Sequence, residues 1–68
     1  MTVIINGKPT ELPYALTLAE LLIQNGVAPD QRGVAIAFND EVVVKSQWNK
    51  LTVQEGDRLE IVRATQGG

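Results

Sequence analysis

The chain has 68 residues, 44% of them hydrophobic and 21% charged, and it contains neither cysteine nor histidine. This composition is typical of one small globular domain, and the missing residue types exclude disulfides, thiol nucleophiles, zinc-finger sites and catalysis by histidine. The net charge of −2 disfavours nonspecific binding to nucleic acid. No apolar run approaches the roughly 20 residues that cross a bilayer, and "MTVIING" lacks the features of a signal peptide. We therefore expect a cytoplasmic protein that has no membrane partner.

The N-terminal part of the chain predicts a β-hairpin. The β-branched run "TVIING" ends in Asn6-Gly7, a dipeptide that tolerates the positive φ angles of a type I′ turn. The chain should return as a second strand from Lys8 to Leu12. Pro13 should end that strand, because proline cannot donate a hydrogen bond to a sheet.

A helix is predicted over about residues 17–25. Thr17 and Glu20 have the spacing of a capping box, and Gly26 suits the left-handed position that closes a helix. The helix should bury one apolar stripe, which consists of Leu18, Leu21 and Leu22.

The second half of the chain predicts three further strands. "VAIAF" alternates in side-chain size, "EVVVK" returns after the turn at Asn39-Asp40, and "RLEIVRA" supplies the last strand. Between them, residues 46–56 should fold back onto the core through Trp48, Leu51 and Val53. One helix with one apolar stripe covers one face of a sheet, so we expect a two-layer α+β domain whose other sheet face is uncovered.

The side chains offer little chemistry. Glu55, Asp57 and Glu60 lie close together in the sequence, but such charges usually only solvate a surface. Asp57 is explained more simply as the polar residue of a tight turn after Gly56. The lone Trp48 is likewise more often a core residue than a binding platform. We expect no metal site and no bound cofactor.

The C-terminal "TQGG" stands apart from this pattern. Its terminal carboxylate is ionised and unreactive until something activates it. Gly67 and Gly68 lack a Cβ atom, so this end of the chain can enter a narrow channel in a partner. Residues 65–68 can extend about 13 Å beyond the last strand. We therefore expect a flexible tail, residues 65–68, whose carboxylate a partner activates.

Taken together, "INGKP", "VAIAFN", Trp48, "EGDRLEIV" and the final "QGG" resemble the thiamin-biosynthesis sulfur carrier family over essentially the whole chain. The resemblance implies a β-grasp, ubiquitin-like domain over residues 1–64, with a mixed sheet of four to five strands and one main helix packed on one face. One departure lies in "VVVKSQW", where Val44 and Lys45 occupy places that are commonly Pro and Arg in the family.

The resemblance also implies a mechanism and a set of partners. A ubiquitin-activating-like adenylyltransferase would use ATP and Mg²⁺ to convert the Gly68 carboxylate to an acyl-adenylate. Sulfur from a cysteine desulfurase route would then displace AMP and leave a thiocarboxylate, which thiazole synthase would accept for the thiazole ring of thiamin. On this interpretation the chain is a protein cosubstrate and not an enzyme.

The family fold orients the last strand and suggests a docking face. Leu59 and Ile61 should face the helix, whereas Val62 and Ala64 should lie on the open sheet face. We expect these two residues, with Gln66 and Gly67, to contact the adenylyltransferase. Three alternatives remain open: the small subunit of molybdopterin synthase, a protein modifier joined to lysines through its C-terminus, and a plain β-grasp binding module.

Overall fold

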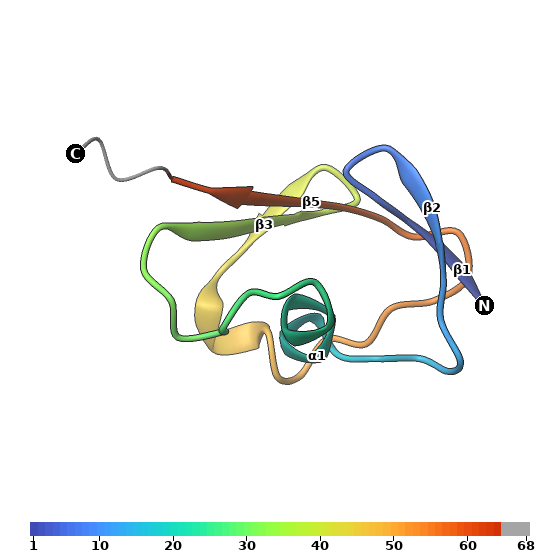
Figure 1. Ribbon diagram of the computed structural model, residues 1–68, viewed down its shortest axis with the longest axis horizontal. Helices are drawn as coiled ribbons and strands as arrows, with labels where there is room; N and C mark the ends of the chain where they lie inside the picture. Colours follow the sequence, from blue (N-terminus) through green and yellow to red (C-terminus); the bar gives the residue numbers. More distant parts are fainter. Residues whose placement is uncertain (65–68) are drawn as a thin grey trace.

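The computed structural model describes residues 1–64 and shows two layers, a five-stranded sheet and one main helix (Figure 1). The elements in chain order are β1 (Thr2–Ile5), β2 (Lys8–Glu11), α1 (Leu18–Gln24), β3 (Val34–Phe38), β4 (Glu41–Val43), the 3₁₀ helix η1 (Lys45–Gln47) and β5 (Arg58–Arg63). The strand order across the sheet is β2-β1-β5-β3-β4. The last strand of the chain therefore lies at the centre, parallel to β1 and antiparallel to β3. The two-layer α+β fold expected from the sequence is confirmed.

β1 and β2 form the predicted hairpin. Both turn residues have positive φ angles, 51° at Asn6 and 81° at Gly7, as a two-residue type I′ turn requires. The β2 strand ends at Glu11, one residue before the predicted end at Leu12. The Leu12 amide still donates a hydrogen bond to the Met1 carbonyl at 2.7 Å, so the two chain segments stay paired beyond the assigned strand.

The helix α1 begins and ends within one residue of the predicted range 17–25, because Thr17 and Asn25 are its caps. The capping box is complete. The Thr17 hydroxyl accepts the Glu20 amide at 3.1 Å, and the Glu20 carboxylate accepts the Thr17 amide at 2.8 Å. Gly26 follows with a φ of 78°, as predicted. No helix in residues 1–64 is long and apolar enough to cross a membrane. The buried residues of α1 are Leu18, Ala19, Leu21 and Leu22.

The crossover between β4 and β5 returns to the core, as expected from its apolar residues. Trp48 is 3% exposed and Val53 is fully buried. The Trp48 indole N–H donates to the Val43 carbonyl at 3.0 Å, and the Val53 amide donates to the Leu16 carbonyl at 3.0 Å. The short helix η1, which precedes Trp48, was not predicted from the sequence.

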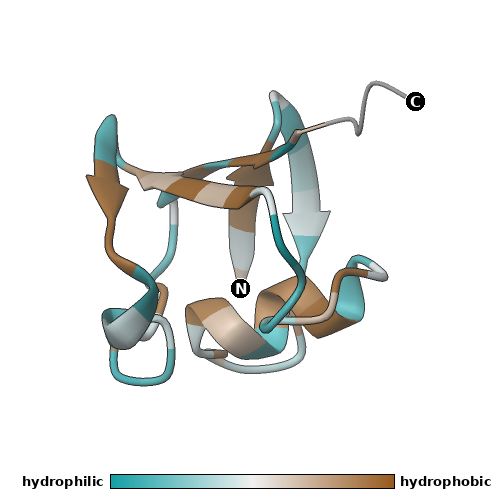
Figure 2. Cartoon of the chain, turned by 90° about the vertical axis from the view of Figure 1, so that its left-hand side faces the viewer, coloured by the Kyte–Doolittle hydropathy of each residue, from teal (hydrophilic) through white to brown (hydrophobic). Residues whose placement is uncertain are grey.

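The two faces of the sheet differ sharply. Ile36 and Leu59 are 1% and 3% exposed and pack against the helix, and Ile61 is half-buried on the same side. Val62 lies on the other face and is 56% exposed. Figure 2 shows the uncovered side of the sheet, opposite the helix layer. The orientations predicted for Leu59, Ile61 and Val62 are confirmed.

The hairpin turn is tied to the central strand by one side chain. The Asn6 side-chain oxygen accepts the Ile61 amide at 2.8 Å, and the side-chain nitrogen donates to the Ile61 carbonyl at 3.3 Å. The Asn6 backbone amide also donates to the Leu59 carbonyl at 2.9 Å. Asn6 thus extends the pairing between β1 and β5 past the end of β1.

We predict that Asn6→Ala lowers the free energy of unfolding by about 2 kcal/mol, because it removes these side-chain bonds and places alanine at positive φ. In Asn6→Gly the new residue tolerates the same φ. This variant should therefore lower the free energy of unfolding by only about 1 kcal/mol, which is the contribution of the hydrogen bonds. Urea unfolding of both variants separates the two contributions. Wild-type stability in Asn6→Ala would contradict this account.

Candidate functional site

The end of β5 is the place from which the C-terminal segment leaves the sheet. Ala64 follows the strand directly, and its amide donates a hydrogen bond to the Gly33 carbonyl at 2.6 Å. In Figure 1 the end of β5 lies beside the segment that enters β3. The predicted site residues Gln66, Gly67 and Gly68 lie outside the described residues. Because β5 is the central strand, the chain leaves from the middle of the sheet and not from its edge.

An apolar surface lies on the open face beside this exit. Val62 is paired with Ala35 on β3, and Ala37 is paired with Val42 on β4, so these side chains share one face. Val42 is 78% exposed and Val62 is 56% exposed. Val44 directly follows β4, has an extended backbone conformation and is 63% exposed. Ala35 and Ala37 are the β3 residues that face the same side as these valines. We call Val42, Val44 and Val62 the valine patch.

Sequence reasoning placed Val62 on this face but missed Val42 and Val44. The strand alternation contained the signal, because residues two apart on a strand face the same side. In "EVVVK" the middle residue, Val43, is half-buried, while its two neighbours are exposed. What the alternation could not give is the pairing of Ala37 with Val42, which places β4 on the same sheet as β5.

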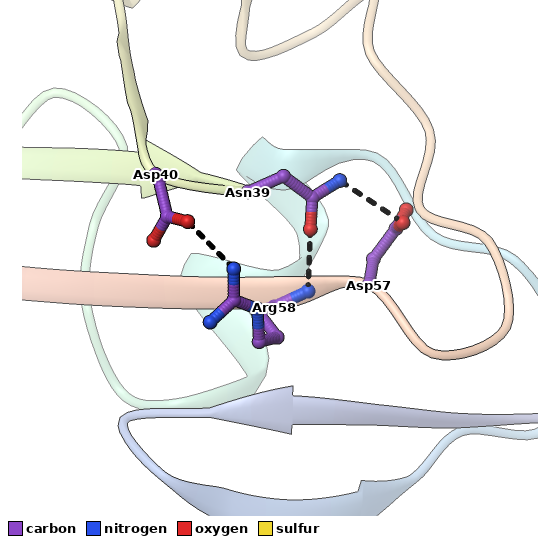
Figure 3. A network of polar contacts seen from close by, with 4 residues as sticks. All are labelled: Asn39, Asp40, Asp57 and Arg58. Carbon is purple, nitrogen blue, oxygen red and sulfur yellow. Dashed lines mark hydrogen bonds and ion pairs between the residues drawn. The ribbon is translucent and has the colours of Figure 1, made fainter.

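The other end of the open face is polar. Arg58 and Asp40 form an exposed ion pair at 2.6 Å, and the Arg58 amide donates to the Asn39 side chain at 2.9 Å. The Asn39 side-chain nitrogen in turn donates to Asp57 at 3.2 Å, as Figure 3 shows. An exposed ion pair contributes at most about 1 kcal/mol. The network therefore serves mainly to hold the turn between β3 and β4 against the start of β5.

Two of the three acidic residues considered in the sequence accept backbone amides, whereas Glu60 lies on β5 opposite Ala37. Glu55 accepts the Thr2 amide at 2.9 Å, and Asp57 accepts the Gln54 amide at 2.7 Å in addition to Asn39. The interpretation of Asp57 as a turn residue is confirmed. Within residues 1–64, no three acidic, histidine or cysteine side chains gather as a metal site would require.

We predict that Asp57→Ala lowers the free energy of unfolding by about 1–2 kcal/mol, because two hydrogen bonds are lost. Millimolar Mg²⁺ or Ca²⁺ should leave the thermal midpoint of the wild-type chain unchanged. A cation-dependent rise in that midpoint that disappears in Asp57→Ala would show that these carboxylates bind a metal.

The model of the ThiS family matches residues 3–68 of this chain. The sulfur carrier protein ThiS of Escherichia coli strain K12 is 31% identical over the whole of both chains. Thiazole synthases of Paramagnetospirillum magneticum and Magnetococcus marinus are 40% and 34% identical over all 68 residues. The chain spans only 20% of the length of these two relatives.

Solved structures show the same fold. The crystal structure of the thiamine biosynthesis protein (ThiS) from Geobacter metallireducens has 31% sequence identity and a TM-score of 0.82, with both chains covered completely. The solution structure of the protein from that organism gives the same TM-score and is covered to 88%. The five-stranded mixed sheet with one main helix is therefore a β-grasp fold, as expected from the sequence.

Proposed function

This chain belongs to the ThiS family, and we propose that it carries sulfur on its C-terminal carboxylate for the formation of the thiazole ring of thiamin. The family places the domain among the small sulfur carriers of thiamin biosynthesis, which are not catalysts. The observation that carries the proposal is the extent of the family match, which continues through the terminal glycines to residue 68.

Activation of the Gly68 carboxylate is the first step. A partner adenylyltransferase uses ATP and Mg²⁺, and a carboxylate oxygen attacks the α-phosphorus so that pyrophosphate leaves. A persulfide supplied by a cysteine desulfurase route then attacks the acyl carbon through its outer sulfur, and AMP leaves as an acyl disulfide forms. A second thiol of the sulfur donor attacks the inner sulfur of that disulfide, which leaves a disulfide on the donor and releases the thiocarboxylate. Glycine suits this position because a residue without Cβ lets the backbone enter a narrow site.

Thiazole synthase is the proposed acceptor of the sulfur. Two relatives that bear this name contain a segment similar to the whole of this chain. A carrier and its acceptor that share one polypeptide have a high effective concentration for each other, which supports a functional pairing. The similar Geobacter structures are named as thiamine biosynthesis proteins, which also favours thiazole synthase over the molybdopterin acceptor.

The valine patch is the proposed docking surface for the adenylyltransferase. It is apolar and exposed, and it includes Val62, which lies two residues before Ala64 on the way to the C-terminus. Burying one valine side chain stabilises a complex by about 1.5–3 kcal/mol. If the adenylyltransferase binds the valine patch, the C-terminal residues stay free of the docking contact. Their carboxylate can then lie close to the partner's nucleotide.

We predict that deletion of Gly67 and Gly68 abolishes adenylation, because the shortened chain no longer brings its carboxylate to the nucleotide. The measurement is ATP–pyrophosphate exchange by the cognate adenylyltransferase, with circular dichroism to verify that the deleted chain folds. Exchange at the wild-type rate with the deleted chain would contradict the proposed site of sulfur attachment.

We predict that Val62→Asp raises the KM of the carrier in the same assay by about tenfold or more, because it places a charge in an apolar interface. Ile23→Asp is the matched control, since Ile23 is 62% exposed on the helix layer, away from the open face. Its KM should stay within about twofold of wild type. Equal values for the two variants would exclude the valine patch as the docking surface.

A further inference from the structure

Gly33 makes the last described contact of the C-terminal segment with the sheet. Val34, the first residue of β3, is paired with Arg63, the last residue of β5. One step beyond this pair, the Ala64 amide donates to the Gly33 carbonyl at 2.6 Å. Gly33, in the loop before β3, thus holds Ala64, the residue that follows β5.

Gly33 also has a close neighbour where a side chain would project. A Cβ atom built on Gly33 would lie 3.1 Å from the Cβ of Ala64, which is tighter than nine in ten real contacts of Cβ atoms and would require Ala64 to shift. The φ of Gly33 is +76°, a conformation that L side chains rarely adopt. Gly7, Gly26 and Gly56 have similar φ values, yet a Cβ on any of them would meet nothing within 4 Å. Among the described glycines with positive φ, only Gly33 combines the backbone requirement with a close neighbour.

We propose that Gly33 is a positioning residue for the C-terminal reaction, a role that rests on the proposed function. By holding Ala64, it fixes the point from which residues 65–68 start. Those four residues reach at most about 13 Å, so the starting point determines where the terminal carboxylate can be placed. Ala64 is also two residues from Val62, so the same contact fixes the exit relative to the valine patch.

Loss of the contact has a defined kinetic consequence. If Ala64 is released, one further residue must be ordered each time the carboxylate enters the partner's site. Ordering the backbone of one residue reduces the productive population by about fivefold to thirtyfold. The valine patch is unchanged, so docking should not weaken. The kcat of adenylation should therefore fall while the KM of the carrier stays within about twofold, the opposite of the effect expected for Val62→Asp.

The test compares Gly33→Ala with Gly26→Ala. Both substitutions place alanine at nearly the same positive φ, +76° and +78°, but only the first approaches Ala64. Gly33→Ala should lower kcat by about fivefold or more, and Gly26→Ala should not lower it. In Gly33→Ala, hydrogen exchange at the Ala64 amide should accelerate. The Ile61 amide, which is held by Asn6, should exchange at its wild-type rate.

A rescue experiment separates positioning from loss of stability. Ala64→Gly removes the Cβ atom that a side chain on Gly33 would meet, so Gly33→Ala should cause no further loss of kcat in the Ala64→Gly background. Ala64→Pro tests the same hydrogen bond by changing its donor instead of its acceptor. It removes the amide that Gly33 binds and leaves Gly33 itself intact, and it should lower kcat as Gly33→Ala does.

An unchanged kcat in Gly33→Ala and Ala64→Pro would overturn the proposal. An equal fall in Gly33→Ala and Gly26→Ala, or a fall that Ala64→Gly does not relieve, would also overturn it, because general destabilisation would then explain the defect. If the wild-type chain is not adenylated at all, the proposed function fails and this inference fails with it. That result is distinguishable from the others, because they compare variants against an active wild type.

Discussion

The central place of β5 between β1 and β3 is the constraint on which the rest of the molecule depends. A parallel neighbour requires a crossover connection, and here the helix and the two hairpin strands β3 and β4 lie between β1 and β5 in the chain. Two amide contacts from outside the paired strands support this arrangement: Asn6 holds Ile61 from the first turn, and Gly33 holds Ala64 from the loop before β3. As a result, the described part of the chain leaves the sheet at Ala64 from the central strand and not from an edge.

One face of the sheet is uncovered in the described part of the chain. Residues 1–64 contain one α-helix, α1, and it packs on one side of the sheet. The core lies between these two layers, where Val3, Leu18, Leu22 and Val53 are fully buried. The opposite face is apolar near the end of β5 and polar near its start. The described residues thus place the exposed side chains of the valine patch and the end of β5 on one sheet.

The parts that could be predicted from the sequence are those fixed by local chemistry. Asn6-Gly7 specifies a turn, and Thr17 with Glu20 specifies a helix start, whatever the rest of the chain does. Strand alternation also gave the face of Val62, once the family resemblance fixed the topology. The 3₁₀ helix η1 could not be predicted, because its place depends on Trp48 reaching the core. The contact between Gly33 and Ala64 joins residues far apart in sequence, so only the register of β3 on β5 reveals it.

The central claim is that Gly68 carries sulfur, and the most direct test is the intact mass of the chain. The chain is incubated with ATP, Mg²⁺, a sulfur source and the cognate adenylyltransferase, and the product is fragmented. This account predicts a species heavier by the difference between one sulfur and one oxygen atom, with the added mass located at Gly68. If only the unmodified mass is found with all of these components present, the C-terminus does not carry sulfur and the account is contradicted.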